Sequence, residues 1–158
     1  MNRYLFVIDY QNDFVDGTLG FPGAEKLDER IAEKVLSYGK GKVLFTRDTH
    51  LENYMDTQEG KNLPVPHCIK GTDGWKLDLN VAKALEGKAY TPVEKITFGS
   101  VDLPGMIKDA AGEEAFSIEL IGLCTDICVV SNALMIKAQH PAAALTVDAS
   151  CCAGVTPD

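Results

Sequence analysis

Residues 117–138, SIELIGLCTDICVVSNALMIKA, decide the fold because an apolar run breaks at Gly122 and then resumes with helical spacing. The stretch 116–121 is mostly apolar and β-branched and is interrupted by Glu119, which predicts a short strand. After the break, Thr125 or Asp126 is suited to cap a helix. Apolar residues then recur at helical intervals, at Val129, Ala133, Met135 and Ile136. The segment therefore predicts a strand, a turn and a helix, with chemistry expected at the turn.

Cys128 falls in the first turn of that expected helix. The free N–H groups and positive dipole end there favour a thiolate, and beside a cation they can lower a cysteine pKa from about 8.5 to about 3.5–7.5. The same N–H groups could hold a developing oxyanion. Most cysteines are inert core residues, and Cys124, which lies in the turn, fits that description better. Cys128 is a candidate nucleophile if other segments supply its partners.

Length and charge exclude several classes of protein. The 158 residues predict one domain, residues 1–158, and the net charge of −8 disfavours nucleic acid and anionic membrane as partners. No apolar run is as long as a membrane span, and Asp9 interrupts the segment where a signal peptide needs its apolar core. We therefore expect a cytoplasmic protein. Its cysteines are expected to be free thiols: Cys68, Cys124, Cys128, Cys151 and Cys152.

Buried strands and patterned helices alternate along the chain. Strands are expected at residues 4–8, 42–46, 89–93, 116–121 and 144–147, and further helices at 25–38, 78–85 and 103–110. This alternation predicts an α/β fold, a three-layer α/β/α sandwich with a mainly parallel sheet. The long polar stretch 47–74 is typical of a functional loop. Thr156 and Pro157 resemble a helix start, so the chain as given is expected to lack a final covering helix.

Asp9 directly follows the first expected strand. Ligand crevices of open α/β sheets lie at the carboxyl ends of strands, where the strand order reverses. If the strands 4–8 and 116–121 flank that point, Asp9 and Cys128 face one crevice. A lone aspartate in this position could equally cap a turn. No G-x-G-x-x-G follows the first strand, which argues against a dinucleotide site.

Two further groups of residues carry possible chemistry. Asp48 and His50 follow the second expected strand and His67 lies in the long loop. In extended backbone, residues two apart point to the same side, so Asp48 and His50 can ligate one ion, although D-x-H alone is a weak signal. Lys95 follows the third expected strand and alone would be read as a surface cation. Beside a cysteine and a carboxylate it could stabilise a thiolate by its charge.

The segments VIDYQNDF, FTRDTH, PHCIKGTDG, EKITFGS and GLCTDICVVSNA together resemble the isochorismatase-like cysteine hydrolases, and among them most of all the nicotinamidases. The resemblance implies the isochorismatase-like hydrolase fold and a catalytic triad of Asp9, Lys95 and Cys128. It also implies an oxyanion hole formed by the backbone N–H groups of Cys124 and Cys128, and a cis peptide at Leu123–Cys124.

The resemblance further implies a divalent metal site. Three ligands would be Asp48, His50 and His67, and the fourth comes from the intervening loop, where many nicotinamidases have a histidine and this chain has none. Some members place a glutamate there, which makes Glu59 the candidate, with Asp56 or Glu52 as alternatives. The expected ion is zinc, with iron or manganese as alternatives.

The implied activity is hydrolysis of a small carboxamide, nicotinamide to nicotinate and ammonia in pyridine nucleotide salvage, through a cysteine thioester, with Phe14 lining the ring pocket. One alternative is a related hydrolase that acts on another small amide, on a carbamoyl or ureido compound, or on isochorismate. Cleavage of isochorismate is disfavoured because the chain combines a pair of metal ligands with a candidate nucleophilic cysteine. Another is a non-catalytic binding module whose Cys128 is a redox-sensing thiol. The expected partner is a small-molecule amide, and a homo-oligomer is left open.

Overall fold

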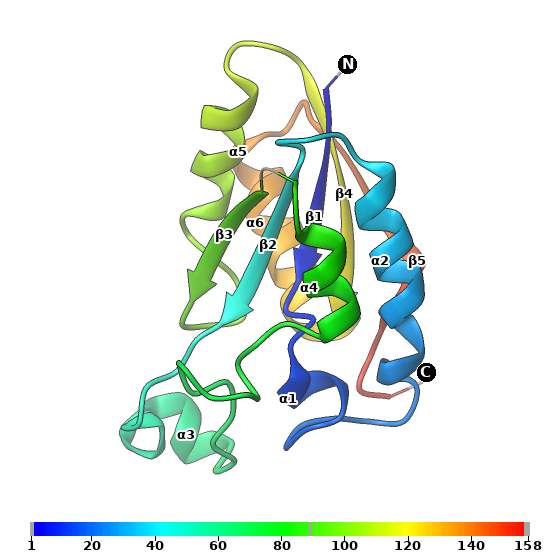
Figure 1. The fold of residues 1–158 in the computed structure, drawn as a ribbon. Coiled ribbons are helices and arrows are strands. Elements are labelled where there is room, and N and C mark those ends of the chain that lie inside the picture. The colour runs from blue at the N-terminus through cyan, green and yellow to red at the C-terminus, as the bar shows by residue number, and fades with distance from the viewer. Residues whose placement is uncertain (1, 89, 157–158) are drawn as a thin grey trace.

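The computed structural model describes residues 2–88 and 90–156. Its sheet has the order β3-β2-β1-β4-β5, and neighbouring strands are parallel (Figure 1). The strands are β1 (Asn2–Ile8), β2 (Val43–Asp48), β3 (Tyr90–Lys95), β4 (Phe116–Leu123) and β5 (Ala144–Ala153). The predicted parallel α/β sheet is therefore confirmed.

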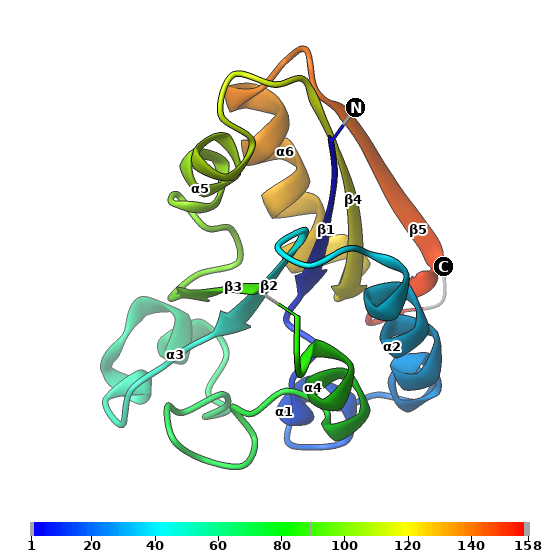
Figure 2. The same cartoon turned by 45° about the horizontal axis from the view of Figure 1, so that its top comes forward.

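Helices cover both faces of this sheet. They are α1 (Asn12–Val15), α2 (Asp28–Ser37), α3 (Gln58–Asn62), α4 (Leu79–Leu85), α5 (Leu103–Ala111) and α6 (Val130–Gln139). Helices α2 and α4 lie on one face, and α5 and α6 lie on the other, with the sheet between them (Figure 2). Helices α1 and α3 lie beyond the arrowheads of β1 and β2 (Figure 1). The predicted three-layer sandwich is thus confirmed.

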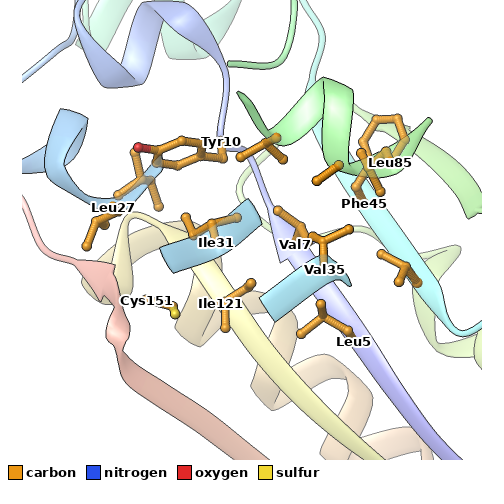
Figure 3. Close-up of a cluster of buried hydrophobic side chains, with 14 of the residues drawn as sticks. Leu5, Val7, Tyr10, Leu27, Ile31, Val35, Phe45, Leu85, Ile121 and Cys151 are labelled. Atoms are coloured by element: carbon orange, nitrogen blue, oxygen red, sulfur yellow. The ribbon is translucent and has the colours of Figure 1, made fainter. Parts of the chain in front are cut away.

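The central strand β1 is buried on both sides, and its side chains alternate between two cores. Leu5 and Val7 pack with Ile31 of α2 in one cluster (Figure 3). Tyr4 and Phe6 pack in the other cluster, with residues of α5 and α6. Burying each such aliphatic side chain stabilises the fold by about 1.5–3 kcal/mol. A one-residue slip of β1 would exchange the two sets, so this apolar run fixes the register.

Several strands run further than the sequence predicts. The pairing of β2 with β3 continues to Asp48 opposite Lys95, so both residues lie in strands rather than after them. Strand β5 extends through Cys151 and Cys152 because it pairs with the end of β4. Residue 89, the expected start of the third strand, lies outside the described residues, as does Pro157 of the expected final helix start.

The prediction that Thr125 or Asp126 caps α6 is wrong. The chain turns through a π-helical segment, Thr125–Val129, in which the Cys124 carbonyl accepts hydrogen bonds from the N–H groups of Ile127 and Val129. Thr125 and Asp126 therefore fall inside the first turn rather than before it. Asp126 instead accepts a hydrogen bond from the Val155 N–H, 3.4 Å away.

The loop after β2 contains a 3₁₀ turn (Tyr54–Asp56) and α3, and a second 3₁₀ turn (Ala24–Leu27) precedes α2, which begins later than predicted. The short helix α1 was not predicted. Among the described residues, no helix combines the length and apolar character that crossing a membrane requires.

Candidate active site

The ends of β1 and β4 form the centre of the site. These strands are neighbours in the sheet, and the chain moves from β1 to one side and from β4 to the other, so they flank the point where strand order reverses. Gly122 adopts a φ of +117°, and a Cβ there would overlap the Ile8 carbonyl. Glycine is thus required where the two strands end together. The implied cis peptide at Leu123–Cys124 is present.

Asp9 leaves β1 with a φ of +45°, a left-handed conformation that is unfavourable for most residues. Its N–H donates to the Thr46 hydroxyl at 3.1 Å, and that hydroxyl donates back to the Asp9 carboxylate at 2.6 Å. Thr46 on β2 therefore holds both the backbone and the side chain of Asp9.

Three candidate catalytic residues meet at this point. Lys95 Nζ lies 2.6 Å from Asp9 Oδ2 and 3.6 Å from Cys128 Sγ, and it also donates to the Thr97 carbonyl at 3.0 Å. Their exposed fractions are 0% for Asp9, 4% for Lys95 and 6% for Cys128. Residues from three separate strand ends thus form one buried cluster, in which the cation lies beside both the carboxylate and the thiol.

Burial decides the protonation of this cluster. It raises the pKa of Asp9, and the charge of Lys95 only partly offsets this effect. Burial opposes the charge on Lys95, but Asp9 and Cys128 outweigh it and raise the Lys95 pKa. The pKa of Cys128 is raised by burial first and then by the Asp9 charge. The expectation that the helix start lowers the Cys128 pKa is therefore wrong for the resting site, and the thiol needs a proton acceptor.

A second cluster, formed by Asp48, His50, Glu59 and His67, lies beside the first. Their ligand atoms all lie within 4.8 Å of one another. Asp48 Oδ2 is 3.1 Å from His50 Nε2 and 3.3 Å from His67 Nε2, and Glu59 Oε1 is 3.7 Å from both nitrogens. Ligands bound tetrahedrally at about 2.1 Å would lie about 3.4 Å apart, so these separations fit a zinc-sized divalent ion.

The charges in this cluster also favour a cation. Burial and the Asp48 charge raise the pKa of Glu59, which means that a second carboxylate here is unfavourable without a positive partner. Burial also opposes ionisation of Asp48, but hydrogen bonds from His50 and His67 outweigh it and lower its pKa. Thr57 caps α3 by accepting from the Gly60 N–H, which holds Glu59 in the first turn. Among the described residues, the alternatives Glu52 and Asp56 are exposed and do not join the cluster.

Residues that the sequence analysis did not single out position this cluster. Gln11 is fully buried, accepts from the Asp48 N–H at 2.7 Å and donates to the Asp48 carbonyl at 2.9 Å. Asp13 accepts from the Cys68 N–H at 2.8 Å. His67 Nδ1 lies 2.8 Å from the Val65 carbonyl, so Nε2 is the ring nitrogen directed at Asp48 and Glu59. Gln11 and Asp13 both lie in the segment that follows β1, but nothing in their residue types or spacing predicts these contacts.

A cavity of about 270 Å³ joins the two clusters. Phe14, the residue expected to line a ring pocket, is among its lining residues, and its ring centroid lies 5.6 Å from that of His67. The polar residues at its walls are Asp48, Glu59, His67, Cys124 and Cys128, and the apolar ones are Phe14, Leu19, Leu63, Phe98, Leu123, Ile127 and Val155. The volume fits one small ring with a substituent, and both cysteines of the expected oxyanion hole face it. Burial, followed by the Asp126 charge, raises the pKa of Cys124 to about 12.

Known proteins resemble this chain over nearly its whole length. The crystal structure of a nicotinamidase/pyrazinamidase from Bacillus subtilis superimposes with a TM-score of 0.81 at 27% identity, covering 99% of this chain and 89% of that one. The nicotinamidase/pyrazinamidase of Mycobacterium tuberculosis is 26% identical over 145 residues, which span 83% of this chain and 76% of that protein. A pyrazinamidase of Pyrococcus horikoshii, crystallised in complex with zinc, shares the fold, with a TM-score of 0.79 at 21% identity over 99% of this chain and 89% of that one.

The isochorismatase domain family matches residues 3–158. Together with the parallel sheet and the site at its reversal point, this match shows that the chain belongs to the isochorismatase family.

Proposed function

We propose that the protein hydrolyses a small carboxamide, with nicotinamide as the leading substrate. The observation that carries this proposal is the buried cluster of Asp9, Lys95 and Cys128, whose thiol lines a single-ring cavity that is also lined by Asp48, Glu59 and His67 of the candidate metal cluster. The likeness to nicotinamidase/pyrazinamidase proteins supports the same activity.

In the proposed reaction, Asp9 accepts the Cys128 proton as Sγ attacks the amide carbon. Lys95, which is 3.6 Å from Sγ, stabilises the negative charge on sulfur. The backbone N–H groups of Cys124 and Cys128 would receive the oxyanion. Asp9 then returns the proton to the leaving nitrogen, the C–N bond breaks and ammonia leaves a thioester on Cys128.

Hydrolysis of the thioester completes the cycle. The water oxygen attacks the acyl carbon while Asp9 accepts a proton from that water. The C–S bond then breaks and the acid is released. Cys128 recovers a proton from Asp9, so the net reaction consumes one water and forms one carboxylic acid and one ammonia. The raised pKa of Asp9 suits this double role, because an acid-base group works best with a pKa near the operating pH.

Asp48, His50, Glu59 and His67 would hold a divalent ion, with zinc as the leading candidate and iron or manganese as alternatives. When bound, this ion supplies a Lewis-acidic position for a lone pair of the substrate, such as a pyridine nitrogen. The zinc in the pyrazinamidase of Pyrococcus horikoshii supports this assignment.

The cavity favours a neutral ring over an anionic substrate. No arginine or lysine stands among the described residues that line it, and the nearest cation, Lys95, is already paired with Asp9 at 2.6 Å. Isochorismate and many carbamoyl compounds carry carboxylates, and apart from the proposed metal ion the described lining offers them no positive partner, which makes their burial costly. A neutral aromatic amide instead matches the apolar walls formed by Phe14, Leu63 and Phe98.

The test is release of ammonia by the purified protein from nicotinamide, pyrazinamide, a ureido acid and an aliphatic amide, with and without added zinc or manganese. The Cys128→Ala variant is the matched control. We expect turnover of the two aromatic amides in the metal-loaded protein and none in the variant. Preference for the ureido acid would support the related hydrolase instead, and no ammonia from any amide would leave the redox-sensing thiol module as the better interpretation.

A further inference from the structure

Asn132 is a fully buried polar side chain on α6, one turn after Cys128. Its amide uses both donors and one acceptor. Nδ2 donates to the Cys128 carbonyl at 2.8 Å and to the Phe98 carbonyl at 3.1 Å, and Oδ1 accepts from the Ser100 N–H at 2.9 Å. These bonds join the turn that carries Cys128 to the segment that follows β3.

That segment, residues 96–100, contributes twice to the site. The Thr97 carbonyl accepts from Lys95 Nζ at 3.0 Å and so helps to aim the ammonium group that lies 3.6 Å from Cys128 Sγ. Phe98 lines the cavity although 48% of its surface is exposed. Within the described residues, the hydrogen bonds that tie this segment to α6 are those of Asn132.

The segment also lies very close to α6. A Cβ added at Gly99 would come within 2.5 Å of Met135 Sδ, and its next contact, Ser131 Cβ, lies at an ordinary 3.6 Å. Glycine at this position therefore allows the close approach that the Asn132 hydrogen bonds need. The Met135 side chain is flexible, so the obstacle at position 99 can be removed by shortening it.

We propose that Asn132 is a positioning residue for the amide-hydrolysing site. Its side-chain amide fixes the segment 96–100 to the turn that carries Cys128. In this way it sets the distance between Lys95 and Cys128 and the position of Phe98 in the cavity wall. The inference rests on the proposed function for its effect on turnover, but its effect on thiol reactivity can be measured without any amide substrate.

Two substitutions at Asn132 distinguish its hydrogen bond to the Cys128 carbonyl from its two hydrogen bonds to the segment 96–100. Asn132→Thr keeps a hydroxyl that can donate to the Cys128 carbonyl four residues earlier, but it cannot span to the segment. Asn132→Leu removes all three bonds at similar volume. Ser131→Ala is the matched control, since the Ser131 hydroxyl donates only to the Ile127 carbonyl of its own helix, at 2.6 Å. Both Asn132 variants should lose the positioning effect, and the control should keep it.

The first measurement is the rate constant for alkylation of Cys128 by iodoacetamide at one alkaline pH, read by peptide mass spectrometry. This rate constant describes each folded molecule, so an inactive fraction in the sample does not change it. We expect alkylation to slow by about 3- to 10-fold in Asn132→Thr and Asn132→Leu, because Lys95 then stabilises the thiolate less. In an amide assay, kcat should fall by about 10- to 10²-fold, more than KM rises, as expected for a misplaced catalytic group.

A second pair of variants tests the same idea from the segment's side. Gly99→Ala should push the segment away from α6 and reproduce the slower alkylation, and Gly99→Ala combined with Met135→Ala should restore it. This pair decides the matter if the Asn132 variants do not fold.

An unchanged alkylation rate in folded Asn132→Thr, or failure of Met135→Ala to rescue Gly99→Ala, would overturn the inference. If the wild-type protein releases no ammonia from any amide, the proposed function fails, and the alkylation series alone then decides whether Asn132 positions Lys95 against Cys128.

Discussion

The Lys95 ammonium lies 2.6 Å from the Asp9 carboxylate in a place where both side chains are almost completely buried. Two charges in such a place are stabilised mainly by each other, because water no longer solvates them. The same pairing leaves one face of the ammonium directed at Cys128 Sγ, 3.6 Å away. Structure and proposed chemistry therefore depend on the same contact.

Replacing Lys95 should harm both stability and turnover. In Lys95→Met, Asp9 is left buried without its cation, and the free energy of unfolding should fall by about 3–5 kcal/mol. Turnover should fall by at least about 10²-fold, since the thiolate loses its stabilising charge. Denaturant unfolding and ammonia release measure the two effects.

The matched control is Lys95→Met combined with Asp9→Asn, which should recover part of the stability and none of the activity. Recovery of activity in the double variant would show that Asp9 and Lys95 serve the fold alone.

The nucleophile prediction separates Cys128 from the other cysteines. Cys128→Ala should reduce turnover by about 10³-fold or more, as loss of a nucleophile does. Cys124→Ala should stay within about 10-fold of wild type, because only its backbone N–H has a proposed role. Steady-state assays on the two variants, with circular dichroism to confirm folding, would decide, and equal losses in both would contradict the assignment.

The pH dependence of turnover follows from Asp9. A proton acceptor must be deprotonated, and burial raises the Asp9 pKa above its ordinary value of 3.8. Activity should therefore be lost as pH falls through that raised pKa, so the acid limb of kcat/KM should lie above pH 3.8. A profile of kcat/KM against pH, taken at saturating metal, measures this. An acid limb at or below pH 3.8 would mean that another group accepts the proton.

Two glycines make a contrasting pair for stability. Gly122 has a positive φ and no room for a Cβ beside Ile8, so Gly122→Ala should be strongly destabilising. Gly105 lies in α5 with no atom within 4 Å of an added Cβ, so Gly105→Ala should stabilise by about 0.5–1 kcal/mol, as helix propensity predicts. Thermal unfolding should show a Tm change of opposite sign for the two, and a stable Gly122→Ala would be incompatible with this packing.

The sequence predicted the layers and the meeting of Asp9 with Cys128 because both follow from local patterns: buried strands, patterned helices and the reversal of strand order. The family resemblance, rather than a local pattern, grouped Asp48, His50 and His67 with Glu59. These four side chains do lie together, although their role as ligands stays a prediction. The pKa of Cys128 was predicted in the wrong direction. The helix start that favours a thiolate is a local feature, whereas burial and the Asp9 charge come from segments far away in the chain.

The sequence analysis did not identify the positioning residues Gln11 and Asn132, for a related reason. Gln11 and Asn132 act through hydrogen bonds to backbone groups, at Asp48 in one case and at Phe98 and Ser100 in the other. Backbone groups are the same in every residue, so no residue type at the other end signals the contact. Only the burial of an amide side chain identifies it, and burial is a property of the folded chain.

The fourth metal ligand gives the last prediction. Glu59 lies within 3.7 Å of both histidine Nε2 atoms, whereas Asp56 is exposed on the preceding turn. Glu59→Gln should therefore weaken metal binding by about 10- to 10²-fold, and the matched change Asp56→Asn should leave it unaltered. Metal content after dialysis against a weak chelator, measured by mass spectrometry, compares the two. Affinity should fall as pH drops, because ligands must be deprotonated. This loss should begin above pH 6.5, since burial lowers the His67 pKa but the hydrogen bonds to Asp48 and Val65, with the charges of Asp48 and Glu59, together outweigh it and raise that pKa. If the ion only holds the substrate, its removal should raise KM and leave the alkylation rate of Cys128 unchanged. Metal loss in Asp56→Asn alone would identify a different fourth ligand, and equal retention in both variants would limit the site to Asp48, His50 and His67.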